Sequence, residues 1–203
     1  MDNTHWPAPI TLTGIHAQLV PLATEHAGGL SDAVRDGELW NLWYTSAPHP
    51  DRMSAEIARR LSLHSTGLML PFTVIDLRDS AAPKVAGMTT YMNVDAANKR
   101  VEIGSTWYAQ SAQRTAINTE CKLLLLKHAF ETLDCIAVEF RTHRLNTQSR
   151  RAIERLGAQL DGILRAHVRM ADGSLRDTCV YSIAAAEWPA IRTHLNWMLT
   201  RPR

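Results

Sequence analysis

Two short polar stretches of the chain carry the residues that could do chemistry. The first is QRTAINT, from Gln113 to Thr119, which leads directly into a strongly apolar helix. A helix N-terminus presents unpaired backbone N–H groups and the positive end of the helix dipole, so it favours an anion. Thr115 or Asn118 could cap this helix, and Arg114 could add a charged hydrogen bond. The stretch therefore predicts either a phosphate site or an ordinary, well-capped helix.

The second stretch is RTHRLNTQSRRAIERLGA, from Arg141 to Ala158, which contains five arginines. A charge run of this kind is most often the solvated face of a helix, and a nucleic-acid surface is the alternative. The formal net charge of the chain is only +2, and no base-stacking aromatic residues lie between the arginines. Both observations argue against nucleic acid as a partner.

Hydrophobic periodicity predicts the elements that must position these stretches. A strand, a buried helix and a second strand follow one another between residues 100 and 142, and this order favours a parallel pair joined by a right-handed crossover. The fold class is therefore α/β, with a mixed, mostly antiparallel sheet of about seven strands flanked by helices, in which strands 4 and 5 are parallel. The predicted strands span residues 14–22, 70–77, 84–93, 100–108, 135–142, 162–170 and 177–183, and the main predicted helices span 24–35 and 51–64 or begin near residues 117, 147 and 187.

The bulk properties fit one globular domain. The chain has 203 residues, of which 45% are hydrophobic, enough for one sizeable core. We expect a single domain over residues 1–203, with an N-terminal arm at 1–11 and a C-terminal helix and tail at 186–203. The three cysteines are scattered, and we recognise no signal peptide or membrane span, so we expect a cytoplasmic protein with reduced thiols. The histidines do not follow a metal-ligand spacing, so we expect no metal.

Taken together, the two stretches resemble the signature motifs of the GNAT acyltransferase superfamily, in the branch of the ribosomal-protein alanine N-acetyltransferases. The pyrophosphate loop of that family, Gln/Arg-x-x-Gly-x-Gly/Ala, is similar to QRTAIN, where Ala116 and Asn118 stand at the two small-residue positions. The second signature, Asn-x-x-Ser-x-x-x-x-Glu-x-Leu-Gly, matches the stretch from Asn146 to Gly157. The resemblance extends from about Ile15 to Trp188.

The resemblance implies an N-acyltransferase. Such an enzyme moves an acetyl or other short acyl group from acyl-CoA to a primary amine by direct attack in a ternary complex. The expected co-substrate is acetyl-CoA or another acyl-CoA, and the acceptor is a small molecule, a protein N-terminus or a lysine. A homodimer through the last helix is left open, and no membrane partner is expected. The alternative is a catalytically silent acyl-CoA-binding protein of the same fold, because the loop lacks its glycines.

The resemblance also implies which residues bind the co-substrate. The backbone of a fourth-strand segment would hold the pantetheine arm, the loop and its arginine would hold the pyrophosphate, and Asn146 would bond the pantetheine. The expected cofactor-binding residues are Trp107, Tyr108, Ala109, Gln113, Arg114, Thr115, Ala116, Ile117, Asn118, Thr119, Asn146, Ser149 and Arg151.

Two residues are expected to be catalytic. Ser149 occupies the position where this branch places a serine near the sulfur, so it is the candidate proton donor. Many members use a tyrosine one helical turn later, but that position is Ile153 in this chain. Glu102, on the fourth predicted strand, could activate the amine through a water, or it could simply pair with an arginine.

Other residues with reactive or aromatic side chains are expected to pack. His128 falls in the buried helix, which predicts a core histidine rather than a base. Trp40, Trp43 and Tyr44 precede the second predicted helix, and core packing is the favoured interpretation, with walls of an acceptor pocket as the alternative.

Overall fold

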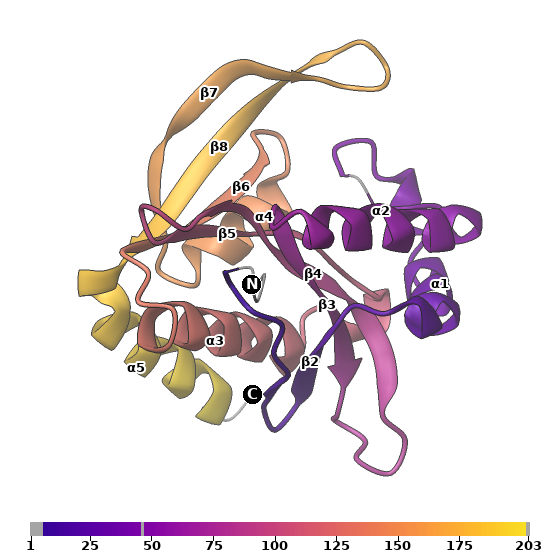
Figure 1. Cartoon of the computed structure of the whole chain (residues 1–203), viewed down its shortest axis with the longest axis horizontal. Coiled ribbons are helices and arrows are strands. Elements are labelled where there is room, and N and C mark those ends of the chain that lie inside the picture. The colour runs from indigo at the N-terminus through magenta and orange to yellow at the C-terminus, as the bar shows by residue number, and fades with distance from the viewer. Residues whose placement is uncertain (1–5, 46, 202–203) are drawn as a thin grey trace.

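The computed structural model describes residues 6–45 and 47–201, in which eight strands form one open sheet (Figure 1). The strand order is β1-β2-β3-β4-β5-β6-β8-β7, and every neighbouring pair is antiparallel except β5 and β6. The predicted mixed sheet and its parallel pair are confirmed. The strands are β1 Leu12–Thr13, β2 Ala17–Pro21, β3 Met69–Asp76, β4 Lys84–Asp95, β5 Arg100–Tyr108, β6 Ala137–His143, β7 Gln159–Arg169 and β8 Leu175–Ala184.

The eighth strand, β1, was not predicted, because two residues are too short to show a period. Of the expected arm and tail, residues 1–5 and 202–203 lie outside the described residues. Within the part that the structure describes, no helix is both long and apolar enough to span a membrane.

Helices cover the sheet on both faces. On one face α1 packs against β4 and α2 against β3, and on the other face α3 lies over the sheet with α5 packed along it. Each layer has its own hydrophobic cluster. Burial on two sides explains why α3 is apolar nearly all round. The helices are α1 Ala27–Arg35, α2 Met53–Ser65, α3 Ala116–Glu131, α4 Thr147–Glu154 and α5 Trp188–Thr200.

A glycine inside α1 has a packing reason. A Cβ atom added at Gly29 would lie 2.6 Å from a methyl carbon of Val85 on β4, so only glycine lets the helix approach the strand this closely. The predicted helix over 24–35 therefore exists despite its two glycines, although its first turn, Thr24–His26, is a 3-10 turn.

The parallel strands β5 and β6 stay together for only three residues. Arg100 to Glu102 pair with Ala137 to Glu139, and the two strands diverge beyond that point. On its other edge β5 carries a bulge opposite β4 between Gly104 and Trp107, where Ser105 adopts a positive φ of 47°. The divergence leaves backbone groups of β5 without a β6 partner, and bulges of this kind often lie beside active sites.

Candidate functional site

The start of α3, Gln113 to Thr119, is termed the α3 cradle, and it carries an N-cap that the sequence predicts. Thr115 is the N-cap, since its Oγ1 accepts a hydrogen bond of 3.3 Å from the backbone N–H of Ile117. Asn118, the other predicted cap, lies inside the first turn. The first N–H groups of a helix lack intrahelical acceptors, so those of Ala116 and Asn118 remain available to an anion.

The missing glycines of this loop cause no strain. Ala116 is the first helical residue and Asn118 the third, so both have ordinary helical backbone angles. The left-handed conformation falls instead on Arg114, whose φ is 58°. The Arg114 side chain is exposed and can therefore turn toward an anion held at the helix end.

The second motif begins with a cap and ends with a glycine, as predicted. Asn146 is the N-cap of α4, and its Oδ1 accepts a 3.0 Å hydrogen bond from the backbone N–H of Ser149. The helix ends earlier than predicted, at Glu154 with Arg155 as C-cap, so Gly157 lies two residues beyond the cap and not at C′; its φ of 96° suits glycine there. The cap uses only the side-chain oxygen, and within residues 6–45 and 47–201 nothing accepts from the Asn146 N–H₂, which can therefore donate to a ligand.

Tertiary contacts bring the two motifs together. The side-chain amide of Gln148 donates to Gln113 Oε1 at 3.4 Å, and the guanidinium of Arg155 donates to Thr119 Oγ1 at 3.3 Å. The starts of α3 and α4 are therefore neighbours, although about 30 residues separate them along the chain. Arg151, the other predicted binding residue of α4, is exposed.

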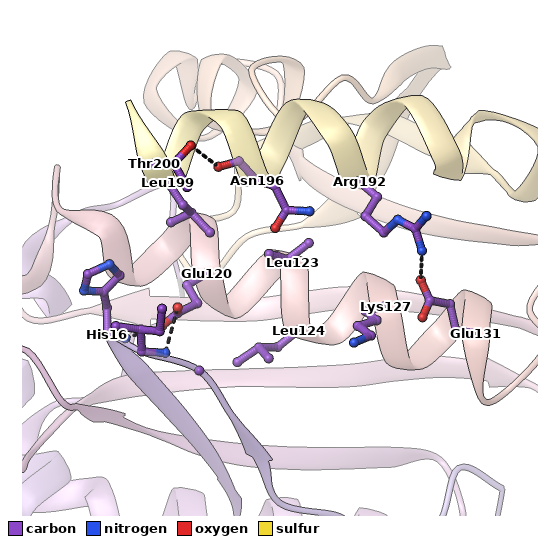
Figure 2. Close-up of a pocket in the computed structure, with 12 residues that line it drawn as sticks. His16, Glu120, Leu123, Leu124, Lys127, Glu131, Arg192, Asn196, Leu199 and Thr200 are labelled. Atoms are coloured by element: carbon purple, nitrogen blue, oxygen red, sulfur yellow. Dashed lines mark hydrogen bonds and ion pairs between the residues drawn. The ribbon is translucent and has the colours of Figure 1, made fainter. Parts of the chain in front are cut away.

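Glu154 of the second motif and Glu120, which directly follows the first stretch, both have structural roles. Glu154 accepts a 2.7 Å hydrogen bond from the buried Tyr181 hydroxyl, which ties α4 to β8. Glu120 is buried, and Figure 2 shows its carboxylate directed at the turn before β2. That carboxylate accepts the backbone N–H groups of Ile15, His16 and Ala17 at 2.6–2.9 Å. Sequence reasoning missed this role; the only signal was an acidic residue within an otherwise buried helix.

Glu102 lies where β5 and β6 begin to diverge. It is 5% exposed and faces Glu139 at the last paired position. Asn93 Nδ2 donates to Glu102 Oε2 at 2.6 Å, and Arg141 Nε lies 3.5 Å from the same oxygen. Burial raises the pKa of Glu102 above its ordinary value, although the Asn93 hydrogen bond and the charge of Arg141 oppose this effect. A carboxylate in this setting can accept a proton.

The same face of the sheet continues as a polar row on β6 and β8. His143 ends β6, and its ring lies 5.2 Å from that of Trp43, which reaches over from the α1–α2 connection. Burial lowers the pKa of His143, and the nearby charge of Arg176 adds to the effect. Trp43 is 54% exposed, so the prediction that it packs in the core is wrong. It covers the end of β6 because His143 offers it an edge-to-face contact.

The remaining predicted packing residues behave as expected or nearly so. His128 is buried with its Nδ1 3.5 Å from the Tyr91 hydroxyl, which confirms a core histidine. Trp40 is partly buried against the α1–α2 cluster, and its ring contacts that of His49.

The predicted backbone segment after the bulge is partly occupied by the chain itself. The N–H of Ala109 donates to Ala86 O at 2.8 Å, and Gln113 Nε2 donates to the carbonyl of Tyr108 at 3.0 Å. Trp107 differs, because its indole Nε1 is buried and has no hydrogen-bond partner among the described residues. A donor left unmatched in this way fits a ligand that brings an acceptor.

Two hollows flank this arrangement. The larger, of about 990 Å³, lies between the start of α2 and the tip of the β7–β8 hairpin, and Trp40, Glu56 and Ala171 are among its walls. The smaller, of about 380 Å³, lies between α3 and α5 over Leu123, Leu124 and Leu199 (Figure 2). The Glu131–Arg192 ion pair of 3.0 Å closes one end of the smaller hollow. Only the larger one adjoins the α1–α2 connection that contacts β6.

Residues 17–159 match the family model described as Acetyltransferase (GNAT) domain. The chain belongs to the GNAT acetyltransferase family. The matched range includes the α3 cradle, Glu102 and the whole α4 motif, so the resemblance of the two motifs is confirmed.

Known proteins similar to this GNAT chain agree with that assignment. YdaF of Bacillus subtilis, described by name as a candidate ribosomal N-acetyltransferase, is 31% identical over 104 residues, which are 51% of this chain and 56% of YdaF. The match therefore spans little more than half the length of that relative. A GCN5-related N-acetyltransferase from Brucella melitensis is 31% identical, with a TM-score of 0.80 over 95% of this chain and 86% of the other. RimJ of Mycobacterium smegmatis, solved with CoA-disulfide, is 22% identical with a TM-score of 0.78 over 96% of both chains, which shows the shared fold.

Proposed function

We propose that this protein is an N-acetyltransferase that moves the acetyl group of acetyl-CoA to a primary amine by direct attack in a ternary complex. The observation that carries the proposal is the opening between β5 and β6. The α3 and α4 caps lie next to each other beside it, and the buried carboxylate of Glu102 lies at its closed end. The RimJ structure contains a CoA disulfide, and the name of YdaF describes an N-acetyltransferase, which supports the same activity in this chain.

The residues present fit acetyl-CoA as co-substrate. The N–H groups of Ala116 and Asn118, with the exposed guanidinium of Arg114, suit the pyrophosphate. The free side-chain N–H₂ of Asn146 and the unmatched indole N–H of Trp107 suit the amide groups of the pantetheine arm. Because Arg114 supplies the left-handed turn, the missing glycines do not favour the catalytically silent alternative.

The reaction needs two proton transfers, one from the amine and one to the departing sulfur, and different side chains of the opening would carry them out. An alkyl amine is protonated at neutral pH and must lose a proton before it attacks a thioester. Glu102, with its pKa raised by burial, would take that proton directly or through a water. Free N–H groups of the diverging β5 strand would stabilise the oxyanion, and the Ser149 hydroxyl would donate a proton to the departing sulfur.

The acceptor that we propose is a peptide or protein amine. The larger hollow is open and broad, and it is bounded by the α1–α2 connection and the hairpin tip, so a chain end can enter it. YdaF, a ribosomal N-acetyltransferase by name, is in keeping with a protein acceptor. We further propose that residues 1–203 act as one domain.

The test combines binding and turnover. Acetyl-CoA at 100 times its Kd should stabilise the fold by about 2.7 kcal/mol, because it binds only the native state. Mass spectrometry should show acetylated product in a panel of short peptides. Ser149→Ala should lower kcat by about 10–100-fold without changing acetyl-CoA affinity, whereas Thr147→Ala, on the exposed side of the same turn, should change neither. Stabilisation without any acetylated product would refute the proposal.

A further inference from the structure

The polar face around Glu102 carries one positive charge more than its acids can pair. Arg100 and Arg141 both bind Glu139, at 2.5 and 2.9 Å, and Arg141 also approaches Glu102 at 3.5 Å. Arg176, on the neighbouring strand β8, forms no ion pair within residues 6–45 and 47–201. Two carboxylates therefore face three guanidinium groups.

One hydrogen bond orients the Arg176 side chain and leaves most of its donors without a partner among the described residues. Its Nε donates to Thr178 Oγ1 at 3.0 Å, which fixes the plane of the guanidinium, and the two terminal nitrogens have no partner within the described chain. Successive side chains of a strand point to opposite faces, so residues 176, 178 and 180 of β8 share one face. Thr178 pairs with His143, which puts Arg176 on the same face as the polar row. The side chain is partly buried, and burial lowers its pKa.

The surroundings of Arg176 locate it near both the proposed base, Glu102, and His143 at the end of β6. Its charge acts on Glu102, whose pKa it lowers slightly, and on His143, whose pKa it lowers as well. Among the described residues Glu102 forms no ion pair with Arg176, and its Oε2 instead binds Asn93 and Arg141. A partly buried guanidinium whose two terminal nitrogens lack a partner among the described residues favours a planar acceptor that binds both of them. A carboxylate has this geometry.

We infer that Arg176 binds a carboxylate of the acceptor, so that the preferred amines carry an acidic group within a few ångströms of the nitrogen. This inference rests on the proposed function, since it assigns a substrate class to the same site. The carboxylate has two possible sources. It is either the side chain of an aspartate or glutamate next to an N-terminal amine, or the α-carboxylate of a small amino-acid-like amine.

Calorimetric titration of the protein saturated with CoA tests the inference without requiring turnover. One pair of probes is Ala-Asp-amide and Ala-Asn-amide, which differ only in side-chain charge. The other is Ala-Ala and Ala-Ala-amide, which differ only in the terminal carboxylate. In at least one pair the carboxylate probe should bind about 10–100-fold more tightly, as expected for a charged hydrogen-bonded pair, and the pair that shows it identifies the source.

Variants of Arg176 assign the effect to this residue. Arg176→Gln should lower the affinity for the carboxylate probe to that for its amide and leave the affinity for the amide unchanged. Arg176→Lys should restore part of the difference in affinity. Arg144→Gln is the matched control, because Arg144 lies nearby and is already paired with Asp177 at 3.3 Å. That variant should keep the full preference.

The failures of the two proposals are distinguishable. Equal binding of both members of each pair, no binding of any probe, or an equal loss for both members in Arg176→Gln would overturn the role of Arg176. Charge-dependent binding without any acetylated product from acetyl-CoA would overturn the proposed function instead, and would leave the carboxylate site standing. Acetylation of neutral and acidic probes at equal rates would overturn the carboxylate site and leave the proposed function standing.

Discussion

The two halves of the sheet differ in what covers them and in what they bury. The half formed by β2, β3 and β4 lies between α1 and α2 on one face and α3 on the other, and it buries apolar side chains such as Phe72, Val74 and Met88 completely. The half formed by β5, β6 and β8 keeps the α3 layer but carries charged residues on its opposite face, Glu102 and Arg141 among them. Burial of apolar area stabilises the first half, whereas ion pairs dominate one face of the second.

The difference teaches where this fold can hold a site. Exposed or partly exposed ion pairs contribute little to stability, so the polar face is free to serve binding and proton transfer. The enclosed half supplies the hydrophobic stability that this requires. If this division holds, substitutions in the enclosed half should lower stability and spare turnover, and those on the polar face should do the opposite.

The strongest test of the polar half is Glu102→Gln. Removing a general base should lower kcat/KM by about 10²–10⁴-fold, measured with acetyl-CoA and a peptide acceptor. Burial raises the folded pKa of Glu102 above the ordinary 4.5, so the stability it contributes is present below that value and is lost as pH rises through the folded pKa. The variant should therefore be at least as stable as the parent in urea unfolding at pH 7. Full activity in Glu102→Gln would show that the polar half does not supply the general base.

The corresponding test of the enclosed half is Phe72→Ala. Phe72 is fully buried between β3 and α3, and its ring lies 5.8 Å from that of Tyr91. Truncation should lower the free energy of unfolding by about 3–5 kcal/mol, while kcat per folded molecule stays within about twofold. Urea unfolding and active-site titration together measure both quantities. A loss of kcat with little loss of stability would show that the two halves are not separate in role.

Lys122 sharpens the comparison, because it puts a charge on the covered α3 face. Its Nζ donates to Thr106 Oγ1 at 3.0 Å and more weakly to Thr89, and burial lowers its pKa from 10.5 to about 8. The unfolded chain binds more protons than the native state between these pH values, so native stability should rise from pH 8 to 10.5. The rise should be on the order of 3 kcal/mol.

The matched variant for this effect is Lys122→Met, which keeps the length of the side chain. The variant should exceed the parent in unfolding free energy by the largest amount at pH 7, and this gain should shrink as pH approaches 10.5. Urea unfolding at pH 7, 9 and 10.5 measures it. A constant difference across that range would mean that burial does not lower the pKa of Lys122.

Much of the local structure was predictable because its causes are local. The caps Thr115 and Asn146 and the glycine at position 157 follow from the side chains that a helix end requires. The β5–helix–β6 unit follows from a change of period and from the handedness of crossovers. The two-residue β1 has no such signal, and neither does the bulge at Ser105, because bulges are set by strand pairing.

The sequence by itself determined the elements, the caps, the parallel pair and the family motifs, since propensity, periodicity and spacing are properties of neighbouring residues. Only the tertiary structure decided which charges meet. Parallel pairing ends after Glu102, which places that carboxylate at the closed end of the opening. The register of β6 with β8 brings Arg176 to the same face and leaves its guanidinium without an acid among the described residues. Contacts between strands depend on register and divergence, and no short stretch of the chain encodes either one.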